Sequence, residues 1–232
     1  MIININKKRK EFIKIFFYLY IFPLKLSITI VQLLKGGDYM TNAKFENTLA
    51  TFCSPVLFGK KVSNLVSVFK KEIPEVAFLV DEYNKKFKSH GIKIENICEC
   101  EKRILLLVYS EDNLLKHLKE KNVSDILSSY GYIESDDLNE YFHILKTRMA
   151  KEEFPHEIGL FLGYPLSDVK GFIDNNGRNY QYCGYWKVYE NINEAKEMFS
   201  TYDKLKAFTV AELECGRKLD SIVAQFQNKC IA

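Results

Sequence analysis

Residues 154–189 read FPHEIGLFLGYPLSDVKGFIDNNGRNYQYCGYWKVY and are the most distinctive part of this 232-residue chain. Nine of them are aromatic, and the stretch holds the only Trp and five of the eleven Gly residues. Aromatic residues make up only 14% of the whole chain, so the aromatic content of this stretch is well above that of the chain. Because each aromatic side chain can bury a large area, we expect the rest of the fold to be arranged around it.

The positions of proline and glycine in this stretch predict two short helices and then a strand. Pro155 and Pro165 suit helix starts, where the N–H that proline lacks would have no partner. Gly163 and Gly177 can take the left-handed conformation that ends a helix. Apolar and polar side chains alternate over residues 180–189, and this period of two predicts a strand.

Two segments, HEIGLFLGYPLSDVKGFI (156–173) and GYWKVY (184–189), resemble an uncharacterised bacterial family, domain-of-unknown-function family 3793. The likeness is specific across residues 154–190. It extends more loosely over the region from Cys53 to Tyr109, and residues 1–39 lie outside it. The resemblance implies a shared fold and no particular chemistry.

The rest of the chain predicts one compact α+β domain over residues 40–232, with a small, mainly antiparallel sheet covered by helices. This length suffices for a single core. Residues 103–110 contain an uninterrupted apolar run, which is typical of a strand buried on both faces. We expect strands near 64–69, 92–100, 103–109 and 180–189.

Helices are predicted around these strands. One covers Phe45–Phe52 and should end near Cys53-Ser54-Pro55, since Pro55 disfavours the helical conformation of Ser54. Others are predicted near residues 74–90, 114–118, 126–130, 138–149 and 195–202.

Two helix starts are predicted from capping residues. Ser135 should cap the helix that begins near Leu138. Thr209 and Glu212 have the spacing of a capping box, which predicts that the last helix begins there.

Charge is distributed unevenly along the chain. Residues 1–39 contain seven basic and two acidic residues, and the remaining 26 basic and 28 acidic residues leave a formal charge of −2 on the body of the protein. A slightly acidic body lacks the electrostatic footprint of a general nucleic-acid binder.

We expect residues 1–39 to be a translated leader, with translation starting at Met40. Residues 35–38, Lys-Gly-Gly-Asp, can be encoded as AAA-GGA-GGT-GAT, which contains the bacterial ribosome-binding sequence AGGAGG. The alternative is an N-terminal anchor through the apolar residues 12–34, which would place the domain at a membrane. Without that anchor, a cytoplasmic protein is expected.

The cysteines and histidines predict no metal site. The six Cys residues match neither a zinc pattern nor a CxxC redox pair, and reduced thiols in a cytosolic protein are the simplest interpretation. His156-Glu157 lacks the second His of a zinc helix, because Leu160 occupies that position. No cofactor can be named from the sequence.

Cys53, His156 and Glu157 are the candidate catalytic residues. If Cys53 and His156 met in space, they could act as a thiol nucleophile and its base. The structural alternative is that Cys53 packs as a small hydrophobe and Glu157 serves a helix N-terminus. Whether the protein is an enzyme is left open.

Tyr182, Tyr185, Trp186 and Lys187 are the candidate ligand-binding residues. Aromatic faces and the close backbone approach that Gly184 allows would suit a planar ligand such as a nucleotide or flavin. A core strand of ordinary aromatic residues is the alternative. The first functional hypothesis is therefore a cytosolic small-ligand-binding or accessory protein that uses residues 154–189.

Residues 155–174 also resemble a DNA-binding helix-turn-helix. The second helix of that motif must present basic and base-reading side chains. Here it offers Lys170 against Asp168 and Asp174, so a nucleic-acid partner is not expected. A small molecule is the expected partner.

Overall fold

The computed structural model describes residues 37–151 and 154–231, so most of the predicted leader, residues 1–36, lies outside the described residues. The first half of the chain contains α2 (Gly37–Leu57), β1 (Ser63–Phe69), α3 (Val76–Phe87), the 3₁₀-helix η2 (Lys88–His90), β2 (Ile92–Glu99), β3 (Arg103–Ser110), α4 (Glu111–Leu118) and α5 (Lys121–Ser129). The second half contains α6 (Leu138–Met149), α7 (Ile158–Phe161), α8 (Leu166–Asp174), β4 (Tyr182–Cys183), β5 (Lys187–Val188), α9 (Ile192–Glu214) and α10 (Leu219–Ile231).

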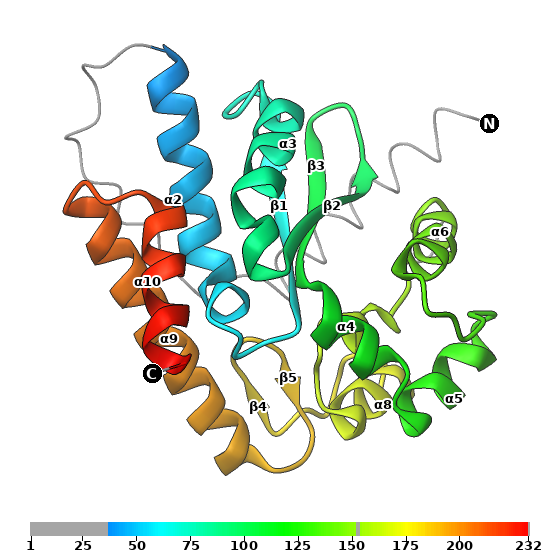
Figure 1. The fold of residues 1–232 in the computed structure, drawn as a ribbon. Coiled ribbons are helices and arrows are strands. Elements are labelled where there is room, and N and C mark those ends of the chain that lie inside the picture. Colours follow the sequence, from blue (N-terminus) through cyan, green and yellow to red (C-terminus); the bar gives the residue numbers. More distant parts are fainter. Residues whose placement is uncertain (1–36, 152–153, 232) are drawn as a thin grey trace.

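The central element is an antiparallel three-stranded sheet with the order β1-β3-β2. Alternate residues of β3 enter two different core clusters. Leu105 and Leu107 pack with residues of α4 to α8, whereas Leu106 and Val108 pack with residues of α2, α3 and α10. Helices thus cover both faces of the sheet, as Figure 1 shows. This arrangement confirms the predicted α+β class and the predicted burial of β3 on both faces.

The strand pairing contains one irregularity. Asn96 pairs with Leu106 and Cys98 with Leu105, so Ile97 is the extra residue of a β-bulge in β2. The bulge shifts the alternation of β2 by one residue: Ile97 and the adjacent Cys98 both pack on the same cluster, whereas neighbouring residues of a regular strand point to opposite faces. A single extra residue has this effect because side chains alternate between faces along a strand.

The predicted strand at 180–189 is wrong. The segment forms a separate hairpin in which Tyr182 pairs with Val188 and Cys183 with Lys187. Gly184 lies in its turn, and a Cβ atom there would be 2.2 Å from the Phe199 ring. The prediction of a close backbone approach at Gly184 is confirmed, but the chain reverses there instead of continuing.

The predicted end of the first helix near Cys53-Ser54-Pro55 is also wrong, because α2 continues through Pro55 to Leu57. The predicted start at Thr209 is wrong as well, since Thr209 lies inside α9. The two errors share a physical cause. The hydroxyls of Ser54 and Thr209 are fully buried and lie 2.9 Å apart where α2 packs on α9, and this tertiary contact overrides the local signals.

The cap of α6 differs from the prediction by two residues. Asp137, not Ser135, holds the N-cap position and accepts a hydrogen bond from the Asn139 N–H. Gly163 and Gly177 have φ values of +65° and +69°, as predicted for helix-ending glycines. In the part of the chain that the structure describes, no helix is both long and apolar enough to cross a membrane.

Candidate functional site

Asp168 joins the two segments that carry the family resemblance. It lies in the first turn of α8 and is buried. Its Oδ2 accepts a hydrogen bond of 2.7 Å from Trp186 Nε1, and its Oδ1 accepts bonds from the backbone N–H groups of Tyr189 (2.7 Å) and Glu190 (3.2 Å). The carboxylate therefore anchors the hairpin to α8, which is a structural role.

Glu157 is 1% exposed and pairs with Arg148 of α6. The Arg148 Nε donates to Glu157 Oε1, and the Tyr132 hydroxyl lies 3.2 Å from the same oxygen. The guanidinium also lies 4.9 Å from the centroid of the Tyr130 ring. The sequence suggested only that Glu157 serves a helix N-terminus. The ion pair could not be predicted, because its partner Arg148 lies on another helix.

The structure does not bring the candidate thiol and its base together. Cys53 is fully buried in the cluster formed by α2, α3 and α10, and burial raises the pKa of its thiol to about 12. His156 is exposed, and its ring packs on Phe172 at a centroid distance of 5.1 Å. A buried neutral thiol is a poor nucleophile, so nothing in this geometry supports thiol chemistry at Cys53.

Three of the four candidate ligand-binding residues are engaged within the fold. Trp186 is buried against Asp168, and the Tyr185 hydroxyl donates to Asp203 Oδ1 at 2.8 Å. Lys187 is 8% exposed and donates to the Gly177 carbonyl at 2.6 Å. Tyr182 is different, since it is 36% exposed and faces an open groove.

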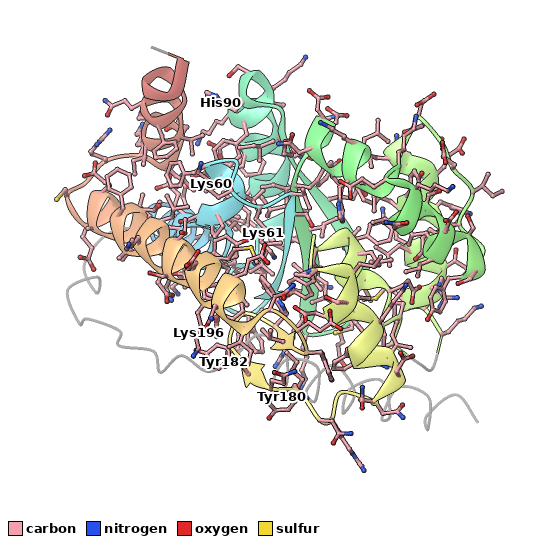
Figure 2. The ribbon with its side chains drawn as sticks, turned by 90° about the horizontal axis from the view of Figure 1, so that it is seen from below. Lys60, Lys61, His90, Tyr180, Tyr182 and Lys196 are labelled. Atoms are coloured by element: carbon pink, nitrogen blue, oxygen red, sulfur yellow. The ribbon has the colours of Figure 1, made fainter. Side chains whose placement is uncertain are left out.

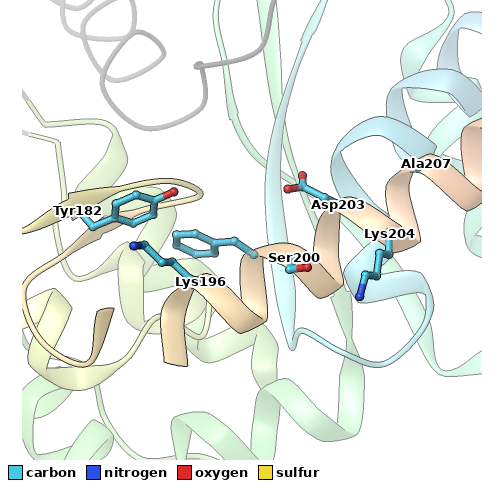
Figure 3. A pocket seen from close by; sticks show the side chains of 7 residues that line it. Tyr182, Lys196, Ser200, Asp203, Lys204 and Ala207 are labelled. Atoms are coloured by element: carbon cyan, nitrogen blue, oxygen red, sulfur yellow. The ribbon is translucent and has the colours of Figure 1, made fainter. Parts of the chain in front are cut away.

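The groove lies between the β4–β5 hairpin and α9 and has a volume of about 510 Å³. Figure 3 shows Tyr182 reaching over α9 from the hairpin, with Lys196 beside it. The amine of Lys196 lies 5.0 Å from the centroid of the Tyr182 ring. The lining residues are Tyr182, Lys196, Phe199, Ser200, Asp203, Lys204 and Ala207.

The polar side of this groove comes from one face of α9. Lys196, Ser200 and Lys204 are spaced four residues apart, and residues at that spacing lie above one another on a helix. Among the described residues, neither lysine forms an ion pair with a carboxylate, whereas Asp203 is engaged by Tyr185. These residues could not be identified from the sequence, because their spacing is equally typical of an ordinary solvated helix face.

The groove has an aromatic end. The rings of Tyr182 and Phe199 are stacked, with centroids 6.1 Å apart and planes at 26°. The Phe199 ring also contacts Tyr185 in a tilted arrangement and Trp186 edge to face, at centroid distances of 5.3 Å and 4.5 Å. The groove wall is therefore continuous with the buried core beneath the hairpin.

The pair of helices predicted as a possible DNA-binding motif corresponds to α7 and α8. Residues 158–161, which form α7, are all buried, and α8 is fixed to the hairpin through Asp168. Lys170 is the exposed basic residue on α8. Within the described residues, no group of three or more His, Cys, Asp or Glu side chains is placed to hold a metal ion.

No curated protein and no solved structure is significantly similar to the chain. A family model described as "Protein of unknown function (DUF3793)" matches residues 49–223. The match covers more than half of the chain, from the middle of α2 into α10, and includes every residue of the groove. The chain therefore belongs to the DUF3793 family.

Proposed function

We propose that this protein binds a small, planar, anionic molecule in the groove between α9 and the β4–β5 hairpin. The observation that carries the proposal is the partly exposed Tyr182 ring, which forms an aromatic wall beside two lysines without a carboxylate partner in the described structure. The Tyr182 ring offers a face to stack on, and the lysines offer positive charge.

The charges of the groove favour an anion. Lys196 and Lys204 contribute two positive charges, and Asp203 contributes one negative charge that already accepts the Tyr185 hydrogen bond. A ligand that places a phosphate or carboxylate along α9 would meet Lys196, Ser200 and Lys204 in turn. A cation would meet two like charges there, which disfavours it.

The size and openness of the groove suit part of a nucleotide or flavin more than a deeply enclosed ligand. A volume of about 510 Å³ lies within the usual range of small-molecule sites. Stacking of a base on an aromatic side chain contributes about 1–3 kcal/mol and tolerates different ring systems. We therefore expect recognition of ring and charge together, with binding weakened when either is missing.

The test is isothermal titration of the full chain with adenosine monophosphate and flavin mononucleotide, compared with uncharged adenosine and riboflavin and with inorganic phosphate. The phosphorylated compounds should bind more tightly than their uncharged counterparts and than phosphate alone. Equal affinity for the charged and uncharged members of a pair, or no binding by any member of the panel, would overturn the proposal.

Variants of the groove sharpen the test. Tyr182→Ala and Lys196→Met should each weaken binding about ten-fold, which corresponds to about 1.4 kcal/mol. Lys206→Met is the matched control, since Lys206 lies on α9 outside the groove. If Lys206→Met weakens binding as much as Lys196→Met does, general charge and not this groove holds the ligand.

A further inference from the structure

Lys61 is a buried lysine without a counter-charge. It lies between the end of α2 and the start of β1 and is 7% exposed; Figure 2 labels it beside Lys60. Its Nζ donates to Asn64 Oδ1 at 2.6 Å and lies 5.0 Å from the centroid of the Tyr164 ring. No carboxylate of a described residue forms an ion pair with it. A neutral amide and one ring face compensate a buried positive charge poorly.

Lys187 shows how the same fold holds a buried ammonium. It is buried to a similar extent, but it donates to the Gly177 carbonyl at 2.6 Å. Its Nζ also lies 4.8 Å from the ring centroid of Tyr180 and 5.6 Å from that of Phe172. Lys187 therefore has a backbone acceptor and two aromatic faces, whereas Lys61 has a side-chain amide and one aromatic face.

The surroundings of Lys61 favour the uncharged amine. Burial lowers its pKa to about 7, and the interaction with Cys53 opposes this only in part. Cys53 supplies no negative charge near neutral pH, because burial raises the pKa of its thiol to about 12. Tyr164 supplies none either, since burial raises the pKa of its hydroxyl. An uncharged lysine has a free lone pair on Nζ and is a nucleophile.

We propose that Lys61 is a carbonyl-reactive lysine, which captures a small aldehyde or ketone as an imine. The lone pair of Nζ attacks the carbonyl carbon and forms the C–N bond, while the C=O π electrons move to oxygen. A proton passes from nitrogen to that oxygen and gives a carbinolamine. Loss of the hydroxyl group together with the remaining nitrogen-bound proton releases one water and forms the C=N bond, so no oxidant or reductant is needed.

The residues beside Lys61 lie nearer the surface. Asn64, whose amide accepts the Lys61 hydrogen bond, is only partly buried, and Lys60 is exposed. An exposed lysine has a pKa of about 10.4, so about one such amine in 2,500 is uncharged at pH 7. About half of the Lys61 amines are uncharged at that pH. The uncharged fraction at pH 7 is therefore far larger at Lys61 than at an exposed lysine.

The test is labelling of the full chain with limiting formaldehyde and sodium cyanoborohydride, which reduces the imine to a stable methylated amine. Chymotryptic peptides are quantified by mass spectrometry over pH 6 to 9, with Lys60 as the internal comparator. At pH 7, Lys61 should label at least ten-fold faster than Lys60. Its rate should level off above about pH 8, while the rate at Lys60 rises about ten-fold per pH unit.

A Lys61 rate no greater than the Lys60 rate at pH 7, or two parallel pH profiles, would overturn the proposal. Asn64→Asp gives a second readout, because it places a carboxylate beside the amine and favours its charged form. Labelling of Lys61 at pH 7 should fall at least ten-fold while labelling of Lys60 stays the same. An unchanged Lys61 rate in a variant with a native circular dichroism spectrum would also contradict the assignment. Lys61 does not line the groove, so a failure of groove binding leaves these outcomes unaffected.

Discussion

The indole Nε1 of Trp186 donates a hydrogen bond of 2.7 Å to Oδ2 of Asp168, and both side chains are 3% exposed. The other carboxylate oxygen receives the backbone N–H of Tyr189, three residues further along the hairpin. The Trp186 ring is also packed between Tyr164, at a centroid distance of 4.9 Å, and Phe199, at 4.5 Å. One buried acid thus holds together the helix, the hairpin and the groove wall.

Replacement of Asp168 by Ala should lower the free energy of unfolding by about 3–5 kcal/mol, because two buried donors and one partly buried donor lose their acceptor. Urea denaturation measures the change. Asp174→Ala is the matched control on the same helix, and since Asp174 is exposed, its effect should stay within about 0.5 kcal/mol. Equal losses in the two variants would show that the Asp168 hydrogen bonds do not stabilise the fold.

Trp186→Ala should cost about 3–5 kcal/mol, as large-to-small core substitutions do. Because Trp186 is the only Trp in the chain, the native fluorescence reports on this one site. The emission maximum should lie well to the blue of exposed indole and shift to the red on unfolding. A native spectrum that already peaks at the wavelength of indole in water would contradict the burial described here.

Arg148→Met should destabilise the protein by about 3–5 kcal/mol, because it leaves the buried Glu157 carboxylate without its ion-pair partner. The double variant Arg148→Met/Glu157→Leu should recover most of this loss, since it removes the unpaired charge as well. The free energies of unfolding of both single variants and the double variant, measured with denaturant, give the double-mutant cycle. Additive losses would show that the two side chains do not interact.

Lys61 makes stability rise with pH just above neutrality. Its folded pKa of about 7 is below the value of about 10.4 expected for the unfolded chain. Between these values the native state binds fewer protons, so the free energy of unfolding increases with pH, by up to about 1.4 kcal/mol per unit. Cys53 acts in the opposite sense above about pH 8.5, because its folded pKa is raised. The useful window is therefore about pH 7 to 8.5.

In that window, Lys61→Met should abolish the rise, and Lys60→Met, at the exposed neighbour, should leave it intact. Thermal unfolding at several pH values measures both. A rise that persists in Lys61→Met would assign it to another group.

The parts of the fold that the sequence predicted correctly are those in which local pattern and burial agree. Because β3 is buried on both faces, its sequence is an unbroken apolar run. Its pairing with β2 follows from the short turn between the two strands. Residues 180–189 alternate as a strand would, but their aromatic rings pack on α8 and α9 around a tight turn at Gly184. The alternation therefore came from packing against helices and not from a continuous strand.

The candidate site was harder to predict, because its residues meet only through tertiary packing. The sequence predicts Tyr182 as a candidate ligand-binding residue, yet its partners Lys196 and Lys204 lie on a helix that has no local sign of a site. Lys61 was missed for a similar reason. A lysine beside a helix end is normally exposed, and only the packing of Tyr164 and Asn64 around it reveals its burial.

The bulge at Ile97 also protects the protein from unwanted association. Within the described sheet, β2 is an outer strand and could in principle template the addition of a strand from another molecule. The bulge breaks the regular spacing of its backbone, and the exposed side chains of Lys93 and Glu99 place charges along the same strand. An irregular, charged edge is a poor template for such growth, so β2 should resist the aggregation to which flat, apolar sheet edges are prone.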